Sequence, residues 1–387
     1  MVFVVVLAVI LAAVVAAAAF DIVPLMLDIL RRRGMGTFKS AEDWFCAANK
    51  TAEKWLENGV PTVPRNAEKR LRIIDYLKGE YKVDAIQHWQ EGSLLLALNE
   101  TGSESAEKFA DKALSDGSSF KSDRVDTAML AFAVLCSEKT DKNEIRPQMD
   151  AAADVLLKKY RRTGGIPYNK DDDVFFVDTV GLVCPFLIRY AFEYGSEEAF
   201  EAAVKTIIGY AEKGLHRELG VPVHCYNKKT GAPLGIYGWG RGCGWWAAGL
   251  ADSHAQLSLS DGHEEEKVML ERLITDFSER MVALQCPDGA FDRTVLNCSG
   301  ADSSATAMLA YFLAYAGKVT GEKKYISAAE KAMGYIFSST RKDGTVDYSQ
   351  GDTIGIGFYS TASIVVPAAQ GFALRAYLML KEENIFD

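Results

Sequence analysis

A chain of 387 residues, 49% of them hydrophobic, exceeds the usual size of a single core, so it forms either two domains or one large closed architecture. Its net charge of -9 argues against a nucleic-acid partner, because no basic surplus is available to neutralise phosphates. Seven cysteines without a C-x-x-C pair argue against a disulfide framework, and the five histidines show no H-E-x-x-H motif and no Cys-His ligand spacing, so we expect no metal site.

The first 36 residues differ from the rest of the chain. Residues 2–20 carry no charge and are long enough to span a membrane as a helix, and RRR follows at residues 31–33. A secretory signal normally has its positive charge before the apolar run, so we expect residues 1–36 to be a membrane anchor. The positive-inside rule, together with the free cysteines, places the rest of the chain in the cytoplasm. The alternative is signal cleavage and secretion, because VVAAAAF offers the small residues of a cleavage site.

Beyond residue 36, apolar residues at helical spacing predominate and strand-like alternation is scarce. Helices with wide buried faces are predicted near Trp55 and from Asp126, Val180 and Ser303. Between them a Gly-containing turn followed by a short extended piece recurs at spacings of roughly 55 to 70 residues, which accommodates two helices per unit. The four copies are TGGIPYN (163–169), LGVPVHCYN (219–227), PDGAFDR (287–293) and KDGTVDYS (342–349).

This weak repeat predicts an all-α chain of helical hairpins. A linear solenoid would need capping ends, whereas a closed ring needs none, and about six hairpins fit the available length. No linker divides residues 37–387, so we expect one domain there. An ordinary irregular helical domain remains the alternative.

The segment GIYGWGRGCGWWAAGL, residues 235–250, predicts a binding surface for a flat, oxygen-rich ligand. Trp239, Trp245 and Trp246 offer faces on which sugar rings stack. Arg241 offers a planar fork for a carboxylate, and the glycines allow close approach of the backbone. The alternative is that the tryptophans fill the core and Arg241 pairs with a buried acid.

Two aspartates are candidates for proton transfer. Asp178 lies between aromatic and apolar residues at a predicted helix start, where desolvation would raise its pKa. Asp126 has a similar position, and for both residues a helix cap is the alternative. His224, with Tyr226 two residues later, follows one of the recurring turns, and it would join Asp178 if these turns line one face of a ring. No G-x-S-x-G, Walker loop or dinucleotide motif is present, so neither a nucleophilic triad nor a nucleotide cofactor is expected.

Taken in order, these segments resemble the unsaturated glucuronyl and rhamnogalacturonyl hydrolases of glycoside hydrolase families 88 and 105. The resemblance covers about residues 40–380. It rests on VDTVGLVCPFLIRYA, VHCYN, WGRGCGWWAAGLADS, LQCPDGAFDR, DSSATAMLAYFLAYAGKVTG and GIGFYSTASIVVPAAQGFAL.

The resemblance implies an (α/α)6 toroid of six helical hairpins after the N-terminal hydrophobic helix. It implies hydrolytic removal of a 4,5-unsaturated uronic acid from the non-reducing end of lyase-generated oligosaccharides, without a cofactor. Asp178 would be the general acid and base, with Asp126 as the second aspartate of the site. The substrate-binding set would be His224, Trp239, Arg241, Trp245, Trp246 and Tyr226.

The sequence departs from the family pattern at HCYNKK, where a tryptophan and an acid often follow the histidine, and this leaves the glycan open. Two rival functions remain. One is a conventional inverting glycosidase that uses Asp126 and Asp178 as an acid–base pair on saturated glycans. The other is a catalytically silent glycan-binding toroid.

Overall fold

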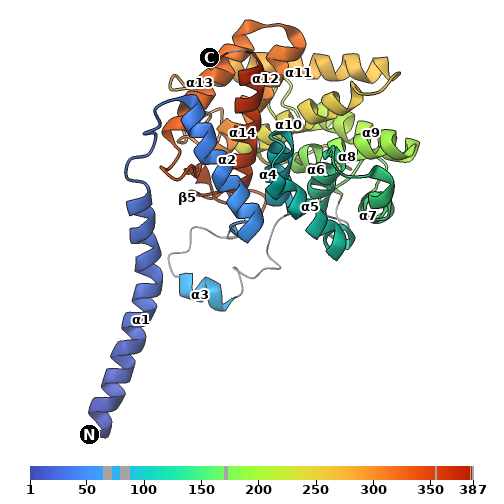
Figure 1. Ribbon diagram of the computed structural model, residues 1–387. Helices are drawn as coiled ribbons and strands as arrows, with labels where there is room; N and C mark the ends of the chain where they lie inside the picture. The colour runs from blue at the N-terminus through green and yellow to red at the C-terminus, as the bar shows by residue number, and fades with distance from the viewer. Residues whose placement is uncertain (64–71, 79–87, 170–172, 354, 384, 386–387) are drawn as a thin grey trace.

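The computed structural model describes residues 1–63, 72–78, 88–169, 173–353, 355–383 and 385. Helix α1 (Val2–Arg31) projects away from a helical body and is exposed along nearly all of its length (Figure 1). Within the described residues it is the one helix long and apolar enough to cross a membrane, by length and composition. Such a helix is compatible with an anchor or a signal sequence.

Six inner helices form a closed ring. Each packs on the next in chain order, and the last returns to the first. Helices α8, α10 and α12 of this ring have long apolar faces. Helix α12, for example, is buried continuously from Ser303 to Gly317, as expected for a helix surrounded by protein. The six are α4 (His88–Glu100), α6 (Thr127–Cys136), α8 (Asp178–Tyr194), α10 (Gly240–Leu257), α12 (Ser303–Thr320) and α14 (Pro367–Glu382).

Six outer helices cover this ring. They are amphipathic, with one buried face and one charged face, because only one side of each meets the inner ring. Their bounds are α2 (Ala41–Asn58), α5 (Glu104–Asp116), α7 (Lys142–Asp154), α9 (Glu197–Lys213), α11 (Glu264–Leu284) and α13 (Lys323–Ser338). Shorter helical pieces are α3 (Arg72–Leu77), the 3-10 turn η2 (Ser119–Lys121) and the π-helical end η3 (Val155–Tyr160).

The predicted toroid of helical hairpins is confirmed, with one feature that the sequence did not indicate. Five hairpins are consecutive in the chain, whereas the sixth pairs α2 with α14, the first and last helices of the body. Figure 1 shows these two helices side by side. The ring is therefore closed by the two ends of the domain.

Neighbouring inner helices approach so closely that glycine is required at the contacts. A Cβ on Gly181 of α8 would lie 2.7 Å from the Trp245 carbonyl oxygen on α10, and a Cβ on Gly249 of α10 would lie 2.6 Å from the Val180 backbone on α8. Real Cβ atoms do not approach backbone this closely, so the two glycines fix the spacing of this helix pair.

In the described part of the chain, five short strands lie next to the N-terminal ends of inner helices. β1 (Val174–Phe176) leads into α8, and β3 (Pro233–Tyr237) leads into α10. They flank β2 (Val223–Asn227) in an antiparallel sheet of order β1-β2-β3, with Phe176 opposite Cys225. β4 (Ser349–Gln350) pairs with β5 (Ser363–Ile364) just before α14. Each outer helix leads the chain back to the end of the ring where the next inner helix begins. The inner helices therefore all begin at the same end, and the strands lie at that end.

The C-terminal end of α1 is attached to the ring domain. Arg32 donates from Nε and Nη2 to the two carboxylate oxygens of Asp347, at 2.9 Å each, and also to the Ser363 carbonyl at 2.9 Å. Arg341 donates to the same buried carboxylate at 2.7 Å. Arg32, in the arginine run that follows the apolar helix, is thus bound to the folded domain.

Candidate active site

Asp178 is the first residue of α8, directly after β1. Its side chain is 15% exposed, and its Oδ2 has no hydrogen-bond partner among the described residues. Burial raises the pKa of Asp178 to about 7, an effect that the positive charge of Arg241 opposes and the carboxylate of Asp352 adds to. The side chain does not cap α8, since the cap residue is Val177. It is therefore a carboxyl group that carries a proton near neutral pH and has one oxygen available.

His224 on β2 faces this carboxyl group. Its Nε2 lies 3.8 Å from Asp178 Oδ2, too far for a hydrogen bond, and its Nδ1 lies 3.0 Å from Tyr359 Oη. The Tyr359 hydroxyl accepts from the Ile236 amide at 3.1 Å, so its own proton is directed to the histidine. This network favours the tautomer with hydrogen on Nε2. Burial, and then Arg241, lower the pKa of His224 to about 4, which keeps the ring neutral at physiological pH.

Aromatic rings surround the pair. The Trp239 ring lies 4.6 Å from the His224 ring and 5.6 Å from the Tyr359 ring, measured between centroids. On the other side, Phe176 meets His224 edge-on at 5.3 Å and Tyr168 packs on Phe176 at 5.1 Å. These rings limit access of water to Asp178 and offer apolar faces to a sugar ring.

Arg241 is buried at the start of α10, where it holds the loop after β4. It donates to the carbonyls of Gln350 at 2.7 Å and Gly351 at 3.0 Å, and its Nη2 lies 3.8 Å from Asp352 Oδ1. Trp239 Nε1 donates to the side chain of Gln350 at 2.9 Å, so both Arg241 and Trp239 bind this loop. Both Nη atoms of Arg241, which were expected to bind a substrate carboxylate, therefore already donate to backbone carbonyls. What Arg241 offers the site is a fixed loop and a positive charge.

Asp126 lies at the start of α6 and is buried, yet its side chain does not cap the helix. It accepts from Arg124 Nε at 3.1 Å and Nη2 at 3.3 Å. It is connected to the Asp178 cluster through Tyr168, whose pKa is raised well above its ordinary value by burial and then by Asp126, Asp178 and Asp352. All three carboxyl groups thus act electrostatically on the same phenol.

Three residues of the predicted substrate-binding set pack against aromatic residues of neighbouring helices. Trp245 packs edge-on against Trp89 of α4, with centroids 5.4 Å apart, inside the ring of inner helices. Trp246 packs on Tyr210 of α9 at 5.8 Å, because consecutive helical residues point about 100° apart and only one of the two tryptophans can face inward. Tyr226 also packs on Tyr210, at 5.4 Å. Trp246 and Tyr226 therefore pack on the outer helix α9, and their role as substrate contacts stays a prediction.

The sequence analysis assigned no role to Tyr168, Gln350, Asp352 and Tyr359, which complete the cluster. The last three come from the loops before α14, more than 100 residues from His224 along the chain. A signal did exist, since GIGFYSTASIVVPAAQGFAL was among the segments that carried the resemblance. Nothing in its spacing marks Tyr359 as the partner of His224.

A closed ring of six inner and six outer helices, with a desolvated acid among aromatic rings at the end where the inner helices begin, defines a toroidal glycoside hydrolase. The sequence profile of glycosyl hydrolase family 88 matches residues 73–380, and the chain belongs to that family. Its enzymatic class, glycoside hydrolase, follows from this membership. No protein with a curated description matches the chain.

Solved structures share the fold at low sequence identity. A possible member of the GH105 family from Salmonella enterica is 19% identical with a TM-score of 0.75, over 90% of this chain and 96% of that one. An unsaturated glucuronyl hydrolase from Bacillus sp. GL1, responsible for the degradation of glycosaminoglycan, is 18% identical with a TM-score of 0.63, over 87% and 95%. A UGL structure with the oligosaccharide dGlcA-Glc-Rha-Glc is 19% identical with a TM-score of 0.65, over 87% and 95%.

Proposed function

We propose that the protein removes a 4,5-unsaturated uronic acid from the non-reducing end of lyase-generated oligosaccharides. The observation that carries this proposal is the state of Asp178, a carboxyl group with a pKa near 7 and an oxygen without a described partner. Hydration of an enol ether needs a proton donor at a carbon atom and then a base for water. One carboxyl group can perform both steps in turn.

In the first step the Asp178 carboxylic acid gives its proton to C4 of the unsaturated ring. A C4–H bond forms from the double-bond electrons, and positive charge develops at C5 and the ring oxygen. The resulting Asp178 carboxylate then takes a proton from water as the water oxygen bonds to C5. The product is a hemiketal that opens and releases the remaining sugar, and Asp178 is again protonated.

The neighbours of Asp178 suit this sequence. His224 presents Nε2–H toward the carboxylate side of the site and stays neutral, so it stabilises the carboxylate once formed without forcing ionisation beforehand. Trp239 and Phe176 provide apolar surfaces for the ring. Arg241 supplies a fixed positive charge that attracts the substrate carboxylate.

The arrangement of Asp126 weighs against the inverting glycosidase. Both of its oxygens accept from Arg124, so this side chain is engaged with the guanidinium group and is not free to activate water. A silent binding toroid would have no need of a carboxyl group with a raised pKa and a free oxygen.

We propose the rhamnogalacturonyl type of substrate, supported by the possible GH105 member with a TM-score of 0.75. The test follows the ultraviolet absorbance of the conjugated double bond while the full-length chain in detergent acts on lyase-digested rhamnogalacturonan or chondroitin. Loss of absorbance, faster on rhamnogalacturonan fragments, is expected. Faster loss on chondroitin fragments would overturn the substrate type, and unchanged absorbance on both would overturn the hydration chemistry.

We also propose that α1 is retained as an anchor, with the ring domain in the cytoplasm. The support is the position of Arg32, which lies directly after the apolar helix and is bound to Asp347. The positive-inside rule assigns such a basic segment to the cytoplasmic side. Protease added to intact cells should leave the ring domain uncut, whereas digestion of the domain without cell lysis would reverse the orientation.

A further inference from the structure

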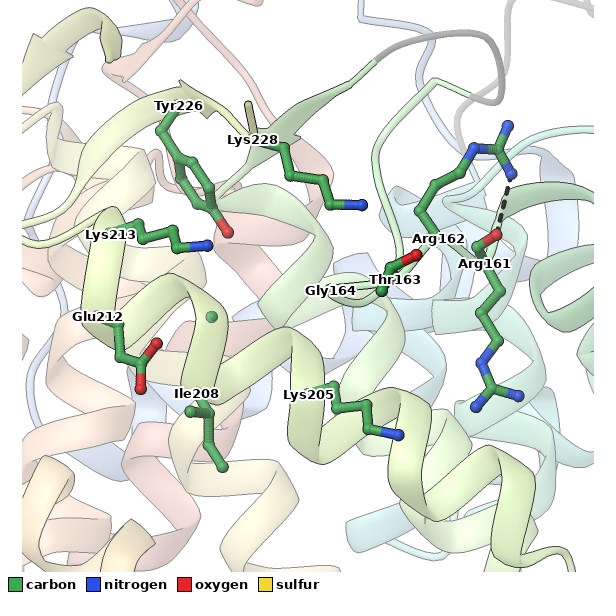
Figure 2. Close-up of a pocket in the computed structure, with 11 residues that line it drawn as sticks. Arg161, Arg162, Thr163, Gly164, Lys205, Ile208, Glu212, Lys213, Tyr226 and Lys228 are labelled. Atoms are coloured by element: carbon green, nitrogen blue, oxygen red, sulfur yellow. Dashed lines mark hydrogen bonds between the residues drawn. The ribbon is translucent and has the colours of Figure 1, made fainter. Parts of the chain in front are cut away.

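A cavity lies on the outer side of the ring, apart from the Asp178 cluster (Figure 2). It has a volume of ≈ 800 Å³ and lies between the turn at residues 162–165, helix α9 and the end of β2. This size is in the range of pockets that hold small molecules. Its lining consists of Arg161, Arg162, Thr163, Gly164, Lys205, Ile208, Gly209, Glu212, Lys213, Tyr226 and Lys228.

The lining is strongly basic although the chain as a whole is acidic. Five of its side chains are cationic and one, Glu212, is a carboxylate, whereas the net charge of the chain is -9. Such a local reversal of charge indicates an anionic ligand, because like charges brought together without one repel each other.

At one end of the cavity the cations have partners on α9. Arg161 donates to Glu198 at 2.5 Å, and Lys205 binds Glu201 at 2.7 Å. Arg161 Nη2 also lies 3.5 Å from Glu201. These pairs satisfy the charge at that end, so it is not where an anion is needed.

The opposite end is different. Among the described residues, neither Lys213 nor Lys228 has a carboxylate within ion-pair distance. In the view of Figure 2 the Lys213 amino group points toward the Tyr226 hydroxyl, and the Lys228 side chain extends away from that hydroxyl on the side of Thr163 and Gly164. The neighbouring Asp173 is already bound by Lys229 at 2.6 Å. Both ammonium groups therefore line this end of the cavity without an ion pair among the described residues, although the charges of Glu212 and Asp173 act nearby.

Tyr226 adds a neutral hydrogen-bond donor at this end. Its hydroxyl has no hydrogen-bond partner among the described residues, and burial, with the nearby Glu212, raises its pKa to about 12, so it stays protonated. Gly209 keeps this region open, since a Cβ there would lie 3.4 Å from Tyr226 Oη and 3.2 Å from the Gly164 carbonyl. This end of the cavity thus holds two cations, the hydroxyl of Tyr226 and the carboxylate of Glu212, around open space.

We infer that this cavity binds an oxyanion, phosphate or sulfate, between Lys213, Lys228 and the Tyr226 hydroxyl. Lysine ammonium groups bind such tetrahedral anions as point charges, and a phenol donates to a third oxygen. The remaining volume accommodates the molecule that carries the anion, of the size of a sugar ester. The site uses β2 from the side opposite to His224, and it does not depend on the proposed hydrolysis.

The test is calorimetric binding to the full-length chain in neutral detergent at about 0.15 M salt, where long-range attraction is screened. The probes are inorganic phosphate, inorganic sulfate, glucose 6-phosphate and galactose 6-sulfate, with glucose as the neutral reference. We expect the anions to bind and glucose not to bind. A sugar ester that binds more tightly than the free ion identifies the ester as the source, and equal affinity identifies the free ion.

Variants locate the site. Lys213→Gln combined with Lys228→Gln should weaken anion binding at least tenfold, and Tyr226→Phe, which keeps the ring, should weaken it severalfold. The matched control combines Lys318→Gln with Lys324→Gln, two exposed lysines whose partners are Glu382 and Glu279. Absence of heat with every anion, equal displacement by chloride, or unchanged binding in the Lys213/Lys228 variant would overturn the assignment. A binding readout keeps this outcome separate from failure of the hydrolase proposal.

Discussion

Replacement of Asp178 by asparagine should lower activity but raise the stability of the folded protein relative to the wild type as the pH rises. Asparagine has nearly the same shape but carries no proton to give, so activity on an unsaturated oligosaccharide should fall by roughly 10³-fold or more. The folded protein, in contrast, should gain stability relative to the wild type as the pH rises, because the variant has no buried carboxyl group to ionise.

The magnitude follows from the raised pKa. The folded protein holds the Asp178 proton up to a pH of about 7, whereas the unfolded chain releases it near the ordinary value of 3.8. Between these values the folded state binds more protons, so this group lowers stability as pH rises, by about 1.4 kcal/mol per pH unit. From about pH 5 to about pH 7 the wild type should lose roughly 2 to 3 kcal/mol that the Asp178→Asn variant keeps.

The assay is urea unfolding of both full-length proteins in detergent, followed by tryptophan fluorescence at several pH values. Any pH-independent cost of burying the asparagine amide is constant across the series and cancels when the two slopes are compared. Asp276→Asn on the exposed face of α11 is the matched control, and it should parallel the wild type. If the Asp178→Asn and wild-type stabilities run parallel between pH 5 and pH 7, Asp178 has an ordinary pKa and the reasoning fails.

Three further outcomes are expected. The value of kcat/KM for hydration should be constant at about pH 5 to 6. It should fall above about pH 7 as Asp178 ionises, and below about pH 4 as His224 becomes charged. A value of kcat/KM that rises through pH 7 would contradict this expectation. Arg241→Lys should lower kcat/KM roughly 10²-fold, since an ammonium group does not reproduce the planar guanidinium that binds two loop carbonyls. Wild-type kinetics in this variant would show that the position of this loop does not matter for catalysis. Gly181→Ala should destabilise the fold by about 1 to 3 kcal/mol in thermal unfolding through its contact with α10, whereas Gly334→Ala on α13, with nothing within 4 Å of the added methyl, should be neutral or stabilising.

Much of the site was predictable from the sequence because its residues lie at the starts of inner helices. Asp178 begins α8, and Arg241 and Trp239 stand at the start of α10. A ring places all such starts at one end, so a periodic pattern of hairpins was sufficient to bring these residues together. His224 joined them because β2 pairs with the strand that leads into α8.

What the sequence did not predict depends on tertiary contacts without a local pattern. The partner of His224 is Tyr359, which reaches it from a loop 135 residues further along the chain. The doubled tryptophan is a similar case, since both residues look equally suited to a ligand until the helix orientation assigns Trp245 to the ring interior and Trp246 to the α9 side. The contacts of Arg241 with two loop carbonyls had no signal in the sequence either, and its role toward a substrate carboxylate stays a prediction.

The pairing of α2 with α14 has a consequence for biosynthesis. A ribosome makes the chain from its N-terminus, so α2 can pack on α4 and α5 soon after synthesis, but the part of its surface that meets α14 stays uncovered until the last helix of the domain has been translated. Contacts across so long a stretch of chain form late, since a large loop must be closed before any of them is gained. During that interval the exposed face is prone to aggregation, and a chain terminated before α14 should be recognised by chaperones or proteases and should not accumulate as a smaller folded form.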